Sequence, residues 1–457
     1  MEKSRISRLV SLIEQACSDL EVQPNASWVE GVALSVYTAM DQSTRVFHQL
    51  EHAFDVAKGQ TGVGIFAALY HDIIYYQVDG RIPEPFVEAV SKYVTIGPKF
   101  SAIRDEKYMT PLTSAIVKIF GLSHGQTITS GPGFNEFLSA LCAADQLSSI
   151  LSPENILEIA AYIEATIPFR VSKPGEKSCC EVLGDRVIES IEELGINISE
   201  GGAHAIVQGA VIFANGDVDG FSSIDTGGFL TETWKLYNEI NPSLRQANSF
   251  FCRSFRESLA NGLKFFQGLE PKRVFHSYLG VPHEAGIEEK VQQVEKNLTI
   301  AISYIKVKLV TIGLVEAIAE LTGGDAPISF FLGENTAYPH KEKIEFYLDP
   351  PLEIDDSKIH SNLVYELLVK GAEKNGFQIA PSPLSTYIHD FLGEDQTVEL
   401  CTHAQQYFEE QMTAMEFLSV VDKSLIRSLL MSCSEICSIR KERMHNLLER
   451  LTTAKAS

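Results

Sequence analysis

The chain has 457 residues, of which 45% are hydrophobic, and a formal net charge of −22. This length is sufficient for two or three domains with ordinary cores, and the acidic balance argues against bulk binding of nucleic acid, which requires clustered Lys and Arg. The eight cysteines contain no Cys-x-x-Cys motif. We therefore expect reduced, mostly buried thiols and no disulfide framework.

Nothing in the sequence predicts a membrane partner. The N-terminal residues do not resemble a secretory signal, and the most apolar long segment, residues 298–321, contains Lys306, Lys308, Glu316 and Glu320. A transmembrane helix of that length would carry few or no charges. These features predict a cytoplasmic protein.

Most of the first 270 residues have helical patterns. Apolar positions in residues 6–20 recur close to the 3.6-residue period, and Asn25 is a capping signal for a helix through about Met40. A third helix, ending at Lys58-Gly59, is expected to carry His48 and His52 on one face, because residues i and i+4 lie one above the other. A fourth, from near Thr61, is expected to carry His71 and Asp72 near its C-terminal end.

The later segments indicate a mainly α protein with a smaller α+β region at its C-terminal end. A helix over residues 135–151 contains Asp145, and the breaker-rich segment 172–178 indicates a domain boundary. Short strands are expected at Ser329–Leu332 and 344–349. These patterns predict a helical domain over residues 1–172, a helical extension over 178–285 packed on it, and a C-terminal α+β domain over 286–457.

Four residues in this order have the chemistry of a divalent metal site: His52, His71, Asp72 and Asp145. Imidazole nitrogens and carboxylate oxygens together suit borderline divalent ions. Asp145 follows the apolar run Leu141-Cys-Ala-Ala144, where a carboxylate is costly to bury unless it is paired or bound to a cation. These residues predict one centre built from three helices.

The order His, His-Asp, Asp resembles the HD superfamily of metal-dependent phosphohydrolases, and the segment from Phe47 to Val56 resembles the His-Asn-x-x-His signature of its cyclic nucleotide phosphodiesterases. The resemblance covers roughly residues 25–170. It implies that His52, His71, Asp72 and Asp145 are the metal ligands. It also implies that His48 protonates the leaving oxygen, although Gln49 stands where the signature has Asn. His124 lies where members with two metal ions place additional histidines.

The resemblance implies hydrolysis of a phosphate ester or a (cyclic) nucleotide by a metal-activated water, with Asp72 orienting that water and His48 acting as general acid. The implied cofactor is Mn²⁺, Fe²⁺, Co²⁺, Mg²⁺ or Zn²⁺, and the implied partner is a small phosphorylated molecule. By charge type alone, Arg104, Arg170 and Lys173 are candidate phosphate contacts.

Three alternatives remain at this point. The first is a catalytically silent HD-fold sensor or scaffold, whose C-terminal region binds a partner or forms a homo-oligomer. The second is a di-iron oxygenase, which requires His124 as a ligand together with a further histidine. A third concerns only the segment Asp217-Val-Asp219-Gly220 with Asp225, which resembles a calcium loop but has Phe221 and Ser222 where a ligand and a glycine belong. A capped surface turn is the simpler interpretation of that segment.

Overall fold

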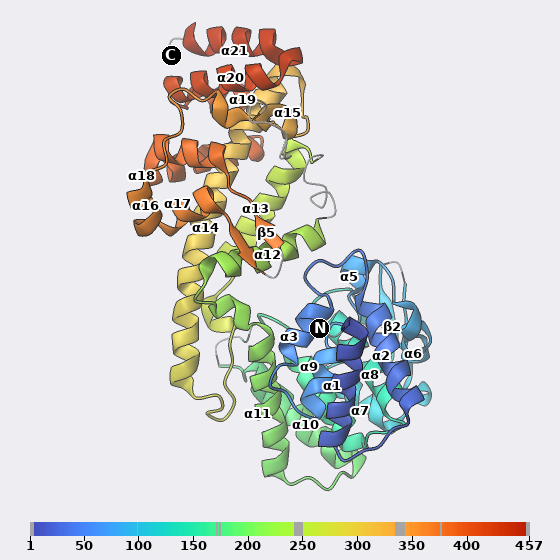
Figure 1. The fold of residues 1–457 in the computed structure, drawn as a ribbon. Helices are drawn as coiled ribbons and strands as arrows, with labels where there is room; N and C mark the ends of the chain where they lie inside the picture. Colours follow the sequence, from blue (N-terminus) through green and yellow to red (C-terminus); the bar gives the residue numbers. More distant parts are fainter. Residues whose placement is uncertain are drawn as a thin grey trace. The chain divides into compact units, whose positions relative to one another are not determined.

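The computed structural model describes residues 4–97, 99–170, 172, 175–241, 250–333, 343–374 and 377–453. Twenty-one α-helices and two small antiparallel sheets lie within these residues (Figure 1). The expectation of a mainly α fold with a small α+β region is confirmed.

The chain divides into two compact units. The first comprises residues 1–222 and 270–294, and the second comprises residues 223–269 and 295–457. This division differs from the expected boundaries at 172–178 and 285. As expected for the extension, α10 (Cys179–Leu194) and α11 (Glu200–Asp217) pack against α9 (Pro153–Ala165) and belong to the first core. Residues 223–269, in contrast, belong to the second unit.

The first unit contains eleven helices among its described residues. In chain order they are α1 (Arg5–Asp19), α2 (Ala26–Met40), α3 (Leu50–Val56), α4 (Val63–Tyr70), α5 (Tyr76–Asp79), α6 (Val87–Tyr93), α7 (Pro111–Ile119), α8 (Phe134–Leu147), α9, α10 and α11. Side-chain caps begin several of them: Asn25 for α2, Ser152 for α9 and Ser199 for α11. The capping signal predicted at Asn25 is confirmed.

Two helices form the centre of the first unit. All eight residues of α4 are buried, and in α8 only Glu136, Asp145 and Gln146 are not. A helix that is apolar on every side can be stable in a soluble protein only when other elements surround it. The helices α1, α3, α8 and α9 contact α4, and its C-terminal end is therefore held rigidly within the core.

A three-stranded antiparallel sheet lies beside these helices. It consists of β1 (Val94–Thr95), β2 (Ser101–Ile103) and β3 (Thr127–Ile128), in the order β1-β2-β3. Val94 is paired with Ile103, and both are buried. The sheet therefore contributes only an edge of the core.

The second unit is also mainly helical. Its helices are α12 (Thr226–Ile240), α13 (Cys252–Gly268), the greater part of α14 (Glu284–Gly323), α15 (Ser329–Leu332), α16 (Asp356–Ser361), α17 (Leu363–Lys370), α18 (Pro383–Phe408), α19 (Ala414–Ser419), α20 (Lys423–Ile436) and α21 (Lys441–Thr453). A hairpin of β4 (Ala372–Lys374) and β5 (Phe377–Ile379) pairs Ala372 with Ile379.

Both strands predicted from sequence in this region are wrong. Ser329–Leu332 forms α15, and Ile344–Phe346 forms a 3₁₀ turn. Runs of four to six apolar residues are too short for their periodicity to distinguish a strand from a helical turn. The strands β4 and β5 lie further along the chain.

The helix α14 is long and apolar enough, by length and composition alone, to cross a membrane. Its most apolar window has a mean hydropathy of 1.8, and 67% of that window is buried within the protein. A helix in the core of a folded unit can be buried to the same extent. The length and composition of one helix are therefore weak evidence for a membrane-spanning segment.

Candidate metal centre

His71 and Asp72 lie at the end of α4 rather than within it. The helix ends at Tyr70, His71 is its C-terminal cap, and Asp72 follows in the turn. The ring nitrogen Nδ1 of His71 lies 2.9 Å from the carbonyl oxygen of Ala68. A proton on Nδ1 donates to that oxygen, so the other nitrogen, Nε2, is left to bind a cation.

His52 lies on α3, whereas His48 precedes that helix. The expectation that one helix carries both histidines is therefore wrong, because α3 begins only at Leu50. Gln49 holds the preceding bend, since its amide donates to the carbonyl oxygen of Arg45 at 2.7 Å. The His48 ring packs against Tyr75, with 4.3 Å between ring centroids. His48 Nε2 lies 3.9 Å from Asp72 Oδ2, at the margin of the centre.

Asp217, the last residue of α11, lies beside both imidazoles and is the candidate fourth donor. Its Oδ1 lies 3.0 Å from His52 Nε2 and 3.4 Å from His71 Nε2. The sequence analysis considered Asp217 only as part of a calcium loop. The sequence carries one weak signal, since the apolar segment 210–214 lies shortly before Asp217.

The spacing of these donors fits one cation. The two Nε2 atoms of His52 and His71 lie 3.3 Å apart, and Asp72 Oδ2 lies 3.5 Å from the first and 2.9 Å from the second. Ligand atoms that lie about 2.1 Å from a shared ion are about 3.0 Å apart at right angles and about 3.4 Å apart in a tetrahedron. The observed distances span that range, so His52, His71 and Asp72 could hold a divalent metal. Asp217, whose Oδ1 lies within 3.4 Å of both imidazoles, is the candidate fourth ligand.

The centre is open to solvent on one side. The side chain of His71 is 1% exposed, whereas those of His52, Asp72 and Asp217 are 13–16% exposed. The deepest ligand is therefore surrounded by protein, and the others form the accessible rim.

The electrostatics of the centre are those of two imidazoles between two carboxylates. Burial lowers the pKa of His52, but hydrogen bonds to Asp217 and Asp72 outweigh it and raise that pKa to about 9. The pKa of His71 is raised for the same reason, mainly by the charges of Asp72 and Asp217 acting against burial. Burial opposes ionisation of both carboxyl groups, but the neighbouring histidines hold the pKa of Asp72 and of Asp217 well below the ordinary value.

These shifts predict opposite effects of pH with and without a cation. After treatment with a chelator, protonated His52 stabilises the fold below its ordinary pKa of 6.5, and this contribution is lost as pH rises through about 9. We expect the melting temperature of the chelated protein to fall between pH 6.5 and 9. A cation requires neutral imidazoles, so the stabilisation by added Mn²⁺ should increase over the same interval. Both expectations are measured by thermal unfolding at each pH, once with chelator and once with Mn²⁺. If the melting temperature has the same pH dependence under the two conditions, the assignment of His52 as a metal ligand is contradicted.

Arg45 holds the turn that carries Asp72. This buried side chain forms an ion pair with Asp79 at 2.7 Å, and both side chains are almost inaccessible to solvent. Its guanidinium also donates to the carbonyl oxygens of Asp72 at 2.7 Å and Ile73 at 3.2 Å. Five donors in a fixed plane allow one Arg to satisfy a carboxylate and two carbonyls together.

Helix α8 holds the same turn from the other side. Ser139 Oγ accepts a hydrogen bond from the backbone N–H of Ile74 at 3.1 Å, and Asn135 Oδ1 accepts one from Tyr76 at 3.0 Å. The turn is therefore fixed through its carbonyls by Arg45 and through its N–H groups by α8. Sequence reasoning missed these positioning residues, because their partners lie far away in the chain.

The predicted ligand Asp145 is not brought to the centre. Its carboxylate accepts hydrogen bonds from Lys92 Nζ at 3.0 Å and from the Tyr93 hydroxyl at 3.2 Å. The carboxylate is still paired, as its apolar surroundings required, but the partner is a lysine and not a metal. The prediction of Asp145 as a ligand is corrected to Asp217, which the fold brings to the imidazoles through α11.

The remaining candidates lie apart from the cluster. His124 is in the turn that leads into β3. In the described part of the chain it does not belong to the group of His52, His71 and Asp72, whose donor atoms lie within 4.8 Å of one another. Arg104 stacks on Tyr108, and Arg170 pairs with the buried Glu164 at 2.6 Å. Lys173 lies outside the described residues.

Glu136, on α8, is a further ionisable group near the centre. Burial raises its pKa to about 7, and the negative charge of Asp72 acts in the same direction. A carboxyl group with this pKa can hold or release a proton near neutral pH. A cation bound at the centre would shift this equilibrium toward the carboxylate, because opposite charges stabilise each other.

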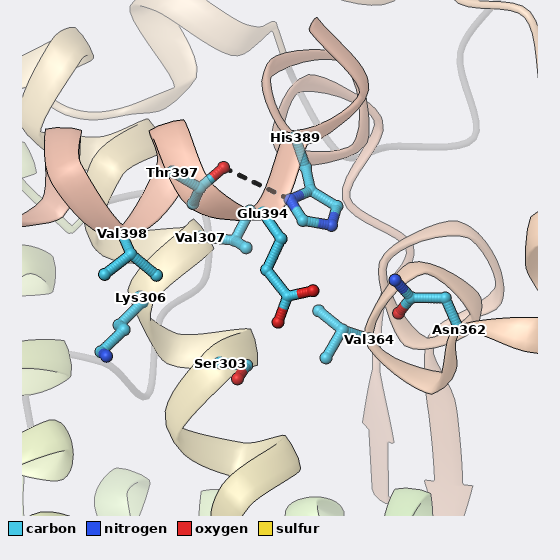
Figure 2. A pocket seen from close by; sticks show the side chains of 9 residues that line it. All are labelled: Ser303, Lys306, Val307, Asn362, Val364, His389, Glu394, Thr397 and Val398. Carbon is cyan, nitrogen blue, oxygen red and sulfur yellow. Dashed lines mark hydrogen bonds between the residues drawn. The ribbon is translucent and has the colours of Figure 1, made fainter. Parts of the chain in front are cut away.

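Two cavities lie away from the centre. One, in the second unit, has a volume of about 40 Å³, sufficient for one or two water molecules. Figure 2 shows this cavity, where a hydrogen bond of 3.4 Å joins His389 Nδ1 and Thr397 Oγ1. The other is a wider hollow in the first unit, lined by the N-terminal ends of α7 and α9. Neither of these two cavities includes a residue of the His–Asp cluster.

Comparison of the chain with models of known protein families, with curated proteins and with solved structures finds no match. The resemblance to the HD superfamily therefore stays a prediction.

Proposed function

We propose that the protein is a metal-dependent hydrolase of phosphoric esters that acts on a small phosphorylated molecule or a nucleotide. The observation that supports this proposal is the gathering of His52, His71 and Asp72, with donor atoms 2.9–3.5 Å apart, beside Asp217 of α11, which lies 3.0 Å from His52 and 3.4 Å from His71. Such a donor set suits Mn²⁺, Fe²⁺, Co²⁺ or Zn²⁺ better than Ca²⁺, which prefers oxygen ligands alone.

A divalent cation in this position would supply positive charge for phosphoryl oxygens and would acidify a coordinated water. The protein's own residues then have distinct tasks. His71, buried and bound to Ala68, fixes the direction of its Nε2. Asp72 could orient an attacking water through a carboxylate oxygen that does not bind the cation.

Two groups could donate a proton to the leaving oxygen. His48 lies at the rim, 3.9 Å from Asp72, and its ring is steadied by Tyr75. Glu136 is the other: burial raises its pKa to about 7 in the protein without a cation, and a cation bound at the centre would lower that pKa. Loss of the true donor removes a general-acid contribution, which is typically 10²–10⁴-fold.

The direct test is a screen of the purified full-length protein with Mn²⁺ against nucleotides, cyclic nucleotides and generic phosphate esters. We expect hydrolysis that a chelator abolishes. In His48→Ala, kcat should be reduced roughly 10²-fold or more, whereas the affinity for Mn²⁺ should be unchanged. Glu136→Gln is the matched variant, since it removes a proton donor without changing shape. If Glu136→Gln has the larger effect on kcat, the donor is Glu136 and not His48.

The same screen separates the alternatives. A protein that binds Mn²⁺ but hydrolyses no ester in the panel would contradict the hydrolase and favour the sensor or scaffold. Two iron atoms per chain with oxygen consumption would favour the oxygenase. One equivalent of a redox-inert metal together with hydrolysis would exclude both.

A further inference from the structure

A second group of metal-binding side chains lies in the first unit. Cys179 and Cys180 begin α10, and His276 belongs to the segment after residue 270 that returns to this unit. The two Sγ atoms lie 3.8 Å apart, and Cys179 Sγ lies 3.8 Å from His276 Nε2. One donor atom from each of the three lies within 4.8 Å of the others.

We propose that Cys179, Cys180 and His276 form a second metal site, selective for a thiophilic divalent ion such as Zn²⁺. Two thiolates about 2.3 Å from a tetrahedral zinc ion are about 3.8 Å apart, and a thiolate and an imidazole nitrogen are about 3.6 Å apart. The cluster therefore has nearly the spacing of the bound state. Three protein ligands leave a fourth position for water, as in other Cys₂His zinc sites.

The positions of the backbone support a preformed site. Ser178 caps α10 through a capping box with Glu181, which fixes the two cysteines in the first helical turn. Asn215 holds His276 through both backbone groups: it accepts from the N–H at 2.9 Å and donates to the carbonyl oxygen at 2.8 Å. Both ligand-bearing segments are thus held in place by hydrogen bonds made elsewhere.

The surroundings favour thiolate, the form that binds metals, at Cys179. The hydrogen bond to Cys179 and burial raise the pKa of Cys180, so a bound cation would have to displace the proton of that thiol. The hydrogen bond from the Cys180 thiol lowers the pKa of Cys179 to about 4, with burial opposing it and His276 and Arg170 assisting it. Arg170 pairs with Glu164, whose second oxygen, Oε2, is buried without a hydrogen-bond partner among the described residues. A cation at the thiols would add positive charge near that carboxylate.

Two other roles for the cysteines fit the geometry less well. Adjacent residues have Cα atoms about 3.8 Å apart, below the roughly 4.4–6.8 Å that disulfides span, so a Cys179–Cys180 disulfide would distort the first turn of α10. A nucleophilic Cys–His pair normally has a third group that orients the imidazole, whereas Asn215 binds the backbone of His276 and not its ring.

Cobalt(II) provides the test, because only a sulfur-containing site gives an intense thiolate-to-cobalt charge-transfer absorption in the near ultraviolet. The His–Asp centre has no sulfur ligand, so the two sites are distinguishable in one titration of the full-length protein. We expect the band in the native protein, its displacement by Zn²⁺, and its loss in Cys179→Ser and Cys180→Ser. His276→Gln should weaken zinc binding by at least about 10-fold.

Cys17→Ser is the matched control, because Cys17 is a buried thiol of α1 in the same unit, and it should retain the band. Asp217→Asn should also retain it, which separates this site from the proposed hydrolytic centre. Native protein without the band at saturating cobalt, or a band that persists in both Cys179→Ser and Cys180→Ser, would overturn the proposal. Circular dichroism of each variant verifies that the fold is kept.

Discussion

Asp217→Asn is expected to weaken Mn²⁺ binding by at least about 100-fold, because replacing even an outer partner of a metal ligand commonly costs 10–100-fold. The amide has the shape of the carboxylate but lacks its charge, and Asp217 lies 3.0 Å from His52. Binding is measured by isothermal titration calorimetry on the chelator-treated protein. Any hydrolytic activity should fall with the affinity at limiting metal.

Asp145→Asn is the matched control for this experiment. It is also a helical aspartate of the first unit, but its partners are Lys92 and Tyr93, so Mn²⁺ affinity should remain within about twofold of the native value. The reverse pattern, with strong loss for Asp145→Asn and none for Asp217→Asn, would restore the original sequence prediction and contradict the ligand set described above.

Arg45→Met is expected to lower the free energy of unfolding of the first unit by about 3–5 kcal/mol, the usual cost of removing one partner of a buried ion pair. It leaves Asp79 charged and buried, and it leaves the carbonyl oxygens of Asp72 and Ile73 without their donor. Mn²⁺ affinity should fall as well, because the turn carrying Asp72 loses its support. The change is measured by urea denaturation in a Trp234→Phe background, where Trp28 of the first unit is the remaining tryptophan.

A double variant separates the two effects of Arg45. Arg45→Met combined with Asp79→Leu removes both charges, so the stability lost through the unpaired carboxylate should return. The metal affinity should not return, because the carbonyl oxygens of the turn still lack a donor. Lys58→Met is the surface control: Lys58 and Asp55 form an exposed pair, which typically contributes under about 1 kcal/mol. Full recovery of metal affinity in the double variant would show that Arg45 does not position the turn.

The sequence was sufficient to predict the helical class and three of the four residues in the centre. Helical periodicity is a local property, so residues 6–20 and the cap at Asn25 could be recognised without the fold. His52, His71 and Asp72 were recognisable because they lie close together in the chain and have metal-binding chemistry. The short apolar runs at 329–332 and 344–346 were misassigned, because so few residues carry no usable period.

The fourth donor depended on tertiary structure. Asp145 directly follows an apolar run, and Asp217 follows one with Asn215 and Gly216 between them. Burial requires only that each carboxylate has a partner. Which partner each one meets depends on the packing of α8 and α11: α8 places Asp145 beside Lys92, and α11 places Asp217 beside His52 and His71. The hydrogen bond from Arg45 to the turn and the contact between Cys179 and His276 also depend on tertiary structure. Contacts between distant segments are determined by how whole helices pack and not by the local pattern of residues.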